Sequence, residues 1–479
     1  MNGEAARATS THQKALRVNL DREKHGTFAE IGAGQEVARW FFHVGGAAGT
    51  VAKSISAYDM AVSDSLYGHS NRYVSRERLE AMLSQEFDSL LHQLLDRRPA
   101  GTTFFVFADT MATRSFTRHQ EGHGWMGVRF QHEVDAQPSE IILHVRMHDT
   151  ENAREQEAIG ILGVNLLYGA WYLGAEPETL IASLMDELTR DRIEIDLVRF
   201  SGPCFRNVDN RLMILQLIVQ SFTGAVMFTA SGEVVQPAEV LYNRSVVVER
   251  GSFRPVTNLT IDMIQRAETL FDDAAARDGG KPVVVMEMTL KNLLEGDRLD
   301  HADFLARADM LGGLGHNVMI TSFGPYFQMA ECLRGYTKGA IVFAMGVPGL
   351  RQLFDPKYYT DLPGGILEGF GRLFCSDVKL CIYPSRDPAT GKLLTMHEAE
   401  VEPRIRHLYE YLLTNGMMVP IENVDEGRLH IFPPDVLSKI QSGDRSWEQM
   451  VPGPAVDVIK ARGLFGYRRR VKDSAIHKI

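Results

Sequence analysis

The chain has 479 residues, of which 44% are hydrophobic and 23% charged, and its formal net charge is −10. These values are typical of a globular protein with two or three domains, and the acidic balance argues against a nucleic-acid-binding protein. Four scattered cysteines argue against a disulfide framework, and neither a signal peptide nor a 20-residue apolar span is evident. We therefore expect a cytoplasmic protein that binds neither nucleic acid nor a membrane.

The N-terminal half predicts a mixed α/β domain over residues 28–255, preceded by a polar arm at residues 1–27. Residues 76–98 place their apolar side chains along one broad face, which is typical of an amphipathic helix. Short runs bounded by turn residues predict strands, and these lie at 102–110, 125–131, 140–149 and 192–202. A mixed sheet is therefore the expected core of this half.

The pattern changes in the C-terminal half, for which we predict a second α/β domain over residues 256–467. Short apolar strands alternate with helical segments, at 282–289, 316–323, 340–347 and 378–384. Strands without polar alternation are buried on both faces, which predicts a mostly parallel sheet covered by helices. Ser322 and Gly346 stand at the ends of such strands, and Gly364-Gly365 begins a later helical segment, for which an ordinary turn or a backbone anion site is expected. Residues 468–479 form a basic tail, either a solvated end or a contact for a partner.

A glycine-rich segment at residues 31–54 is the strongest candidate for ligand binding. It contains two clusters followed by polar residues: Gly32 and Gly34, then Gly45, Gly46 and Gly49, then Thr50 and Lys53. Glycine allows a close backbone approach to a ligand, and N–H groups ahead of a helix attract anions. The segment predicts a phosphate or carboxylate site, with backbone amides holding the anion and Lys53 adding charge. Because no complete nucleotide-binding motif is present, tight turns and close packing are the alternative.

The strand HVRMHD carries the second candidate constellation. His144, Arg146 and His148 share one face because side chains alternate along a strand. We expect Arg146, together with Arg206 in a later turn, to neutralise an anionic ligand. His144 and His148, with Asp149 at the strand end, are the candidate acid–base residues. A solvent-facing strand without a ligand is the alternative.

The histidines of HQEGH raise a separate question about metal binding. His119 and His123 have helical ligand spacing, but Gly122 and Gly124 favour a loop. A metal site would require His119 or His123 to lie within coordinating reach of His144 or His148. We assign no metal ligand on this basis, and the sequence does not identify a cofactor.

Several segments together resemble a family of bacterial proteins of about this length, and the resemblance covers nearly the whole chain. They are GTFAEIGAGQEVARWFF, GTVAKSISAYDM, HGWMGVRFQ, GVNLLYGA, FRNVDNRLM, VERGSFRPVT, WEQMVP and GLFGY. Family members carry the names nicotinate-nucleotide adenylyltransferase and TonB-dependent receptor. The first name implies an early His/Thr-x-Gly-His motif, whereas here the nearest text is Gln120-Glu121-Gly122-His123. The second implies a signal peptide and many membrane strands, so no site residue is transferred from either name.

The leading functional prediction is an enzyme or sensor that binds a small anionic metabolite, phosphorylated or nucleotide-like. It requires residues 45–54 and 144–148 to line one concave pocket. The alternative is a non-catalytic, self-associating structural or regulatory protein whose glycines serve packing and whose apolar ARGLFGY end serves subunit contacts. A homo-oligomer is expected.

Overall fold

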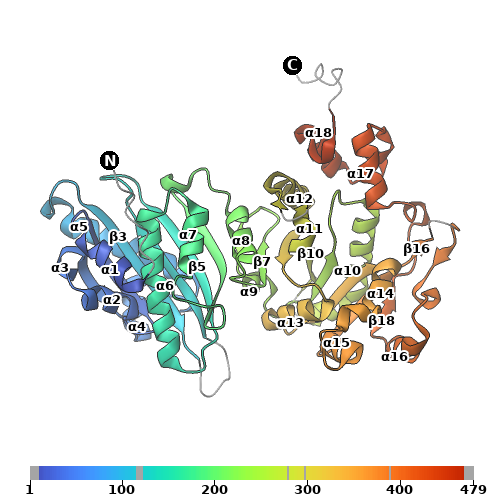
Figure 1. The fold of residues 1–479 in the computed structure, drawn as a ribbon, viewed down its shortest axis with the longest axis horizontal. Coiled ribbons are helices and arrows are strands. Elements are labelled where there is room, and N and C mark those ends of the chain that lie inside the picture. Colours follow the sequence, from blue (N-terminus) through green and yellow to red (C-terminus); the bar gives the residue numbers. More distant parts are fainter. Residues whose placement is uncertain (1–9, 115–121, 278–279, 296–297, 388–389, 469–479) are drawn as a thin grey trace. The chain divides into compact units, whose positions relative to one another are not determined.

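The computed structural model describes residues 10–468, except 115–121, 278–279, 296–297 and 388–389. The chain divides into two compact units, Met1–Gly224 and Ala225–Ile479. Each unit contains its own large sheet with covering helices (Figure 1), which confirms the predicted α/β class. Within the described part of the chain, no helix has the length and apolar character needed to cross a membrane.

The first unit contains a six-stranded mixed sheet in the order β2-β1-β3-β4-β5-β6. Strand β1, next to the edge strand β2, pairs in parallel with β2 and β3, whereas β3 to β6 form antiparallel neighbours. The mixed sheet predicted for this half is therefore confirmed. The strands are β1 (Lys24–Ile31), β2 (Val51–Ile55), β3 (Thr103–Ala112), β4 (Gly122–Phe130), β5 (Ser139–Met147) and β6 (Ile193–Ser201).

Helices cover both faces of this sheet. The amphipathic helix α5 (Arg76–Leu94) packs Leu83 and its other apolar residues against Val106 and neighbouring strand residues. On the opposite face, Phe41 of α2 (Glu36–Val44) contacts Phe28, and Trp171 of α6 (Asn152–Tyr172) contacts Phe105. The other helices of the unit are α1 (Thr11–Leu20), α3 (Ala47–Thr50), α4 (Met60–Tyr67), α7 (Pro177–Leu184) and α8 (Asn210–Val219).

The prediction of a polar arm at residues 1–27 is wrong for the part that the structure describes. Residues 11–27 form α1 and the beginning of β1. Lys14 is completely buried, and its Nζ donates to Asn165 Oδ1 at 2.7 Å and to Asp186 Oδ2 at 2.7 Å. The polar composition of this segment indicated an exposed arm, but a lysine can be buried when polar partners far along the chain bind its ammonium group.

The second unit is built on an eight-stranded sheet in the order β18-β15-β14-β9-β10-β13-β7-β8. The six strands from β18 to β13 are parallel, and β7 and β8 add an antiparallel edge. The predicted, mostly parallel sheet is confirmed. Its large-sheet strands are β7 (Ala225–Phe228), β8 (Val234–Val235), β9 (Val246–Arg250), β10 (Val283–Thr289), β13 (Asn317–Thr321), β14 (Ile341–Gly346), β15 (Val378–Tyr383) and β18 (Met418–Pro420).

The parallel strands are doubly wound. From β9 the chain first builds outward through β10 to β13, and then returns to the other side of β9 to add β14, β15 and β18. The direction of winding therefore reverses between β9 and β14, and such a point leaves a crevice at the carboxyl ends of the strands.

Helices cover the two faces of the second sheet. Helix α10 covers the face that carries Val247, whereas α13, α14 and α15 contribute to the core around Val246 and Val248. The helices are α9 (Pro237–Leu241), α10 (Asn258–Arg277), α11 (Leu290–Leu293), α12 (His301–Gly313), α13 (Tyr326–Tyr336), α14 (Val347–Leu353), α15 (Gly365–Leu373), α16 (Arg406–Thr414), α17 (Pro433–Ser442) and α18 (Gly453–Arg462). Two small hairpins add β11 (Leu294–Glu295), β12 (Arg298–Leu299), β16 (Ser385–Arg386) and β17 (Leu393–Leu394).

The division between the units precedes the boundary predicted at residue 255. Strands β7, β8 and β9 lie before that position but pair within the second sheet, so the second unit begins at Ala225. The change of pattern after residue 255 marks the start of α10 after the first parallel strand, rather than the start of a new core. Residues 469–479, which hold most of the predicted basic tail, lie outside the described residues.

Candidate functional site

The two glycine clusters lie at opposite ends of the parallel strands β1 and β2. Gly32 and Gly34 follow the carboxyl end of β1, whereas Gly45, Gly46 and Gly49 precede the amino end of β2. Because β1 and β2 are parallel, these two ends face opposite directions. Helix α2 spans the distance between them, so the clusters do not form one anion-binding loop.

The helix amides beside the first cluster are already bound by a residue of the same chain. Glu30 accepts hydrogen bonds from Val37 N at 2.8 Å and from Ala38 N at 3.0 Å, at the beginning of α2. Gly32 has a φ of 99°, and a Cβ atom there would lie 1.7 Å from the carbonyl oxygen of Met111. This cluster therefore serves a tight turn and close packing, which was the alternative interpretation of the sequence.

Glu30 has a second buried carboxyl group as its neighbour on β3. Asp109 is paired with Glu30 in the sheet register and accepts a hydrogen bond from Ile31 N at 3.1 Å through Oδ1, while its Oδ2 has no partner among the described residues. Burial, followed by repulsion from Glu30, raises the pKa of Asp109 well above its ordinary value. Burial also raises the pKa of Glu30 to about 7, against the effect of the α2 amides. A proton is therefore retained by this pair near neutral pH.

The second glycine cluster also contacts its own chain. Asn19 Nδ2 donates to the carbonyl oxygen of Gly45 at 2.7 Å, and Thr50 is completely buried. Lys53 on β2 forms an ion pair with Glu86 of α5. The cation that we expected to attract a ligand is thus neutralised by a carboxylate of the neighbouring helix.

Carboxylates of β6 pair with the histidines of β5 that we predicted as acid–base residues. His144 is buried, with its Nδ1 2.5 Å from Asp196 Oδ1, and His148 Nε2 lies 3.3 Å from Glu194 Oε2. Although desolvation acts to raise it, hydrogen bonds from His148 and Thr223 and the charge of Arg146 lower the pKa of Glu194 to about 2. The positive stripe is therefore balanced from the adjacent strand.

The third candidate acid–base residue belongs to an arginine cluster. Asp149 is buried and accepts a hydrogen bond from Arg192 Nε at 2.8 Å, and Arg154 Nε lies 3.3 Å from its Oδ1. These ion pairs give Asp149 a structural role at the end of β5, where it ties α6 and the start of β6 to the strand.

One of the proposed histidine approaches does occur. His123 Nδ1 lies 3.4 Å from His144 Nε2, across neighbouring strands. His119 lies outside the described residues. Among the residues that are described, no group of three or more histidine, cysteine, aspartate or glutamate side chains is arranged to hold a metal ion.

The sheet order contradicts the pocket predicted between residues 45–54 and 144–148. Strands β1, β3 and β4 separate β2 from β5, which corresponds to about 19 Å across the sheet. Arg206 lies near the opposite end of β5 from His148, because the neighbouring Cys204 N donates to Ser139 Oγ at 3.0 Å. The predicted site residues thus lie on strands that are far apart in the first sheet and at both ends of those strands.

A cavity of about 820 Å³ lies instead in the second unit, at the carboxyl ends of its parallel strands. Its wall includes the last residues of β9, β10, β14 and β15 and the turn after β13, and the winding reverses between two of these strands. The beginnings of α10 and α14 and a loop at residues 429–433 complete it. Aromatic side chains line the cavity: Phe323, Tyr326, Tyr358, Tyr359, Tyr383 and Phe432.

Charged groups enter this cavity wall from both faces of β9. Arg250 Nε donates to Glu287 Oε2 at 2.6 Å, and its guanidinium group lies 4.6 Å from the centre of the Tyr326 ring. Glu249 projects to the other face, where it is buried and its Oε2 has no hydrogen-bond partner among the described residues. Burial raises the pKa of Glu249 to about 8.

The rim of the cavity adds groups suited to an anionic ligand. Lys291, at α11, is exposed and forms no ion pair with any residue that the structure describes. Gly346 and Gly349 bring the backbone close to the cavity where β14 leads into α14. Gly346 and Ser322 are recognisable from the sequence as strand-end residues, but no local signal shows that they share a cavity. The missing information was the order of the strands, which alone brings these ends together.

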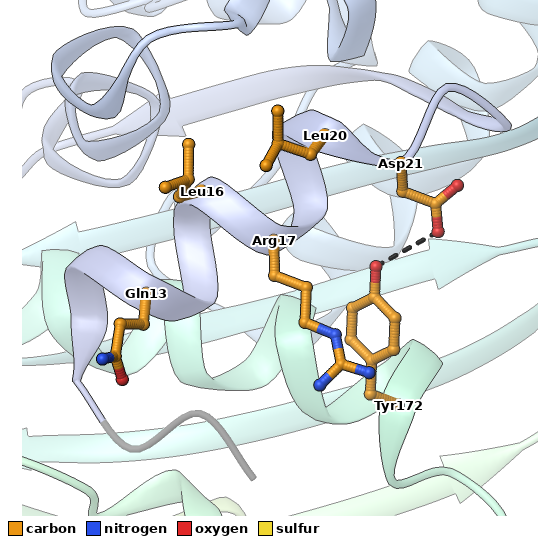
Figure 2. Close-up of a pocket in the computed structure, with 6 residues that line it drawn as sticks. All are labelled: Gln13, Leu16, Arg17, Leu20, Asp21 and Tyr172. Carbon is orange, nitrogen blue, oxygen red and sulfur yellow. Dashed lines mark hydrogen bonds between the residues drawn. The ribbon is translucent and has the colours of Figure 1, made fainter. Parts of the chain in front are cut away.

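A smaller hollow of about 410 Å³ lies on the first unit, beside α1 (Figure 2). Figure 2 shows Arg17 lying against the Tyr172 ring, with 4.4 Å between the guanidinium carbon and the ring centre. The Tyr172 hydroxyl also donates to Asp21 Oδ2 at 3.1 Å. These polar groups are paired with one another, so the hollow is a weaker candidate than the cavity of the second unit.

Comparisons with known proteins yield only remote similarities. No protein-family model matches the chain, and no curated protein matches it significantly. A competence/damage inducible protein of Agrobacterium tumefaciens is 16% identical, over 33% of this chain and 93% of that one, with a TM-score of 0.25. A nicotinic acid mononucleotide adenylyltransferase of Plasmodium falciparum is 9% identical, over 47% and 98% of the two chains, with a TM-score of 0.29. At such values the similarities carry no functional argument, and the geometry of the cavity remains the basis for interpretation.

Proposed function

We propose that the second unit binds a nucleotide-like metabolite in the cavity at the carboxyl edge of its sheet. The observation that carries this proposal is the position of the cavity, where a doubly wound sheet reverses its winding. Crevices at this position are the usual ligand sites of open α/β sheets. The proposal keeps the ligand class expected from the sequence and moves its site away from the glycine segment.

The lining supports a ligand with both a planar ring and an anionic group. A volume of about 820 Å³ accommodates a molecule of nucleotide size. Tyrosine and phenylalanine rings offer flat apolar surfaces against which a base can stack. Lys291 supplies a positive charge that no described side chain neutralises, so it is the natural partner of a phosphate group.

The test compares AMP with adenosine in thermal unfolding of the full-length protein. A ligand at 100 times its Kd stabilises the folded state by about 2.7 kcal/mol, which raises Tm by several degrees. We expect AMP to raise Tm more than adenosine at the same concentration, because only AMP carries the phosphate. The variant Lys291→Gln should reduce the AMP shift to that of adenosine.

Lys281→Gln provides the matched control. Lys281 is also exposed, but it precedes the amino end of β10, whereas Lys291 follows the carboxyl end of the same strand. The AMP shift should survive in this variant. An absence of any shift in the wild type, or an equal loss in both variants, would contradict the proposed function.

A further inference from the structure

The carboxyl group of Glu249 is a buried polar group of the cavity wall that lacks a hydrogen-bond partner among the described residues. Its residue is 7% exposed, and Glu249 forms no hydrogen bond with a described residue. In the sheet it stands between Ala344 of β14 and Met286 of β10. Met263 of α10 belongs to the core on the same face, so the carboxyl group is surrounded largely by apolar side chains.

Nearby charges on β9 and β10 do not compensate Glu249. Arg250 projects to the opposite face, where it binds Glu287 through two nitrogen atoms and donates to the carbonyl oxygen of Gly324. Tyr326 lies beneath the Arg250 guanidinium on that same side. Arg250, the residue next to Glu249 in sequence, is thus ion-paired with Glu287 rather than with Glu249.

The titratable groups nearest the cavity on the face of Glu249, Asp262 of α10 and Tyr383 of β15, are also paired, while Lys379 at the other end of β15 lies 5.5 Å from the centre of the Phe271 ring. Asp262 accepts hydrogen bonds from Arg266 Nε at 2.7 Å and from the Tyr383 hydroxyl at 2.6 Å. Arg428 Nη1 lies 3.6 Å from the other oxygen of Asp262. A buried carboxylate without a cation or donor is costly, and burial accordingly raises the pKa of Glu249 to about 8.

We infer that Glu249 recognises the bound metabolite by donating the proton of its neutral carboxyl group to a hydrogen-bond acceptor, such as a ring nitrogen or carbonyl oxygen. This inference rests on the proposed function, because it names the group that the ligand presents to the inner wall. A neutral carboxyl group has one donor that an ionised carboxylate lacks. The neutral group therefore suits a hydrogen-bond acceptor at this position.

A ligand-free measurement tests the protonation state directly. We expect the infrared spectrum of the wild type at pH 7 to contain the carbonyl band of a protonated carboxyl group that is absent from Glu249→Gln. If the two spectra agree in this region, Glu249 is ionised and the inference is overturned, whatever the protein binds.

A binding measurement tests the role in recognition, with AMP as the probe. Glu249→Met removes the donor and should weaken AMP binding about tenfold, whereas Glu249→Gln keeps an N–H donor and should bind within a few-fold of the wild type. Raising the pH from 6 to 9 should weaken binding by the wild type much more than binding by Glu249→Gln. Thermal unfolding confirms that both variants are folded.

The outcomes separate the two proposals. Unchanged AMP affinity in Glu249→Met, or tighter binding by the wild type at pH 9, overturns the inference about Glu249 and leaves the cavity as a nucleotide site. A wild type that binds no AMP at pH 6 overturns the proposed function, even if the infrared band is present.

Discussion

The side chains of Glu30 and Asp109 make the first unit sensitive to pH. In the unfolded chain both carboxyl groups ionise near pH 4, whereas in the folded unit burial raises both pKa values, to about 7 for Glu30. Their contribution to stability is therefore fully present below about pH 4 and is lost as the pH rises through the folded pKa values. This pair should consequently stabilise the first unit less at pH 8 than at pH 5.

We predict that Asp109→Asn reduces this dependence on pH. Asparagine keeps an oxygen for the Ile31 amide and places an N–H donor near Glu30, so it imitates the protonated aspartate. At pH 8 the variant should be more stable than the wild type by about 1–3 kcal/mol, and the difference should shrink at pH 5. Urea unfolding at the two pH values measures this effect. The exposed Asp88→Asn is the control, and an equal response in both variants would refute the role of the pair.

Sequence patterns identify single residues of the site less well than they identify strands. The apolar run at 102–110 places Asp109 in a strand, but nothing local indicates that Glu30 faces it. Likewise, the alternation of HVRMHD predicts which residues share a face, whereas Asp196, the partner of His144, lies 52 residues away. Local spacing indicates direction along a strand, and it does not reveal which carboxylates the next strand supplies.

At the scale of elements, α2 and α6 approach closely because α6 has glycines where the two helices meet. A Cβ atom on Gly163 would lie 2.3 Å from Val37 Cγ2. We predict that Gly163→Ala destabilises the protein by about 1–3 kcal/mol, since overpacking forces the helices apart. The double variant with Val37→Ala should recover part of the loss, which a double-mutant cycle from urea unfolding measures.

Gly371→Ala in α15 is the matched control for this cycle. A Cβ atom there would meet no heavy atom within 4 Å, so alanine should be neutral or slightly stabilising in the helix. Additive effects of the Gly163 and Val37 changes would show that contact between these side chains is not what limits the approach of the helices.

Most elements could be predicted because their signals are local. The amphipathic pattern at 76–98 corresponds to α5 followed by a short 3-10 turn at Leu95–Arg97. The apolar runs of the C-terminal half correspond to β10, β13, β14 and β15. The helix α1 was missed because its burial depends on Lys14 and its distant polar partners rather than on an apolar stripe.

At the scale of the whole molecule, each unit has a separate sheet and core, and the cavity belongs entirely to the second unit. We predict that residues 225–479 fold when expressed alone and retain the AMP-induced rise in Tm, whereas residues 1–224 fold without such a response. Circular dichroism and thermal unfolding of the two fragments measure this. If residues 225–479 fold but AMP raises the Tm of the full chain only, the ligand site lies elsewhere.

The sequence predicts the type of sheet in each half, because burial on one or both faces leaves a periodic or continuous apolar pattern. It does not predict the strand order, since pairing joins segments such as β9 and β14 that lie about a hundred residues apart. That order creates the cavity, and so the position of the candidate site could not be inferred from local motifs.

The ligand preference of the cavity could change without any change in the sheet. Much of the wall comes from connections that follow a strand, among them residues 347–359 between β14 and α15. Replacing such a connection leaves the ladder of backbone pairs in the sheet intact. Relatives could therefore acquire different ligands by altering only these segments, and exchange of the cavity-lining residues among 347–359 is an engineering route to a new selectivity.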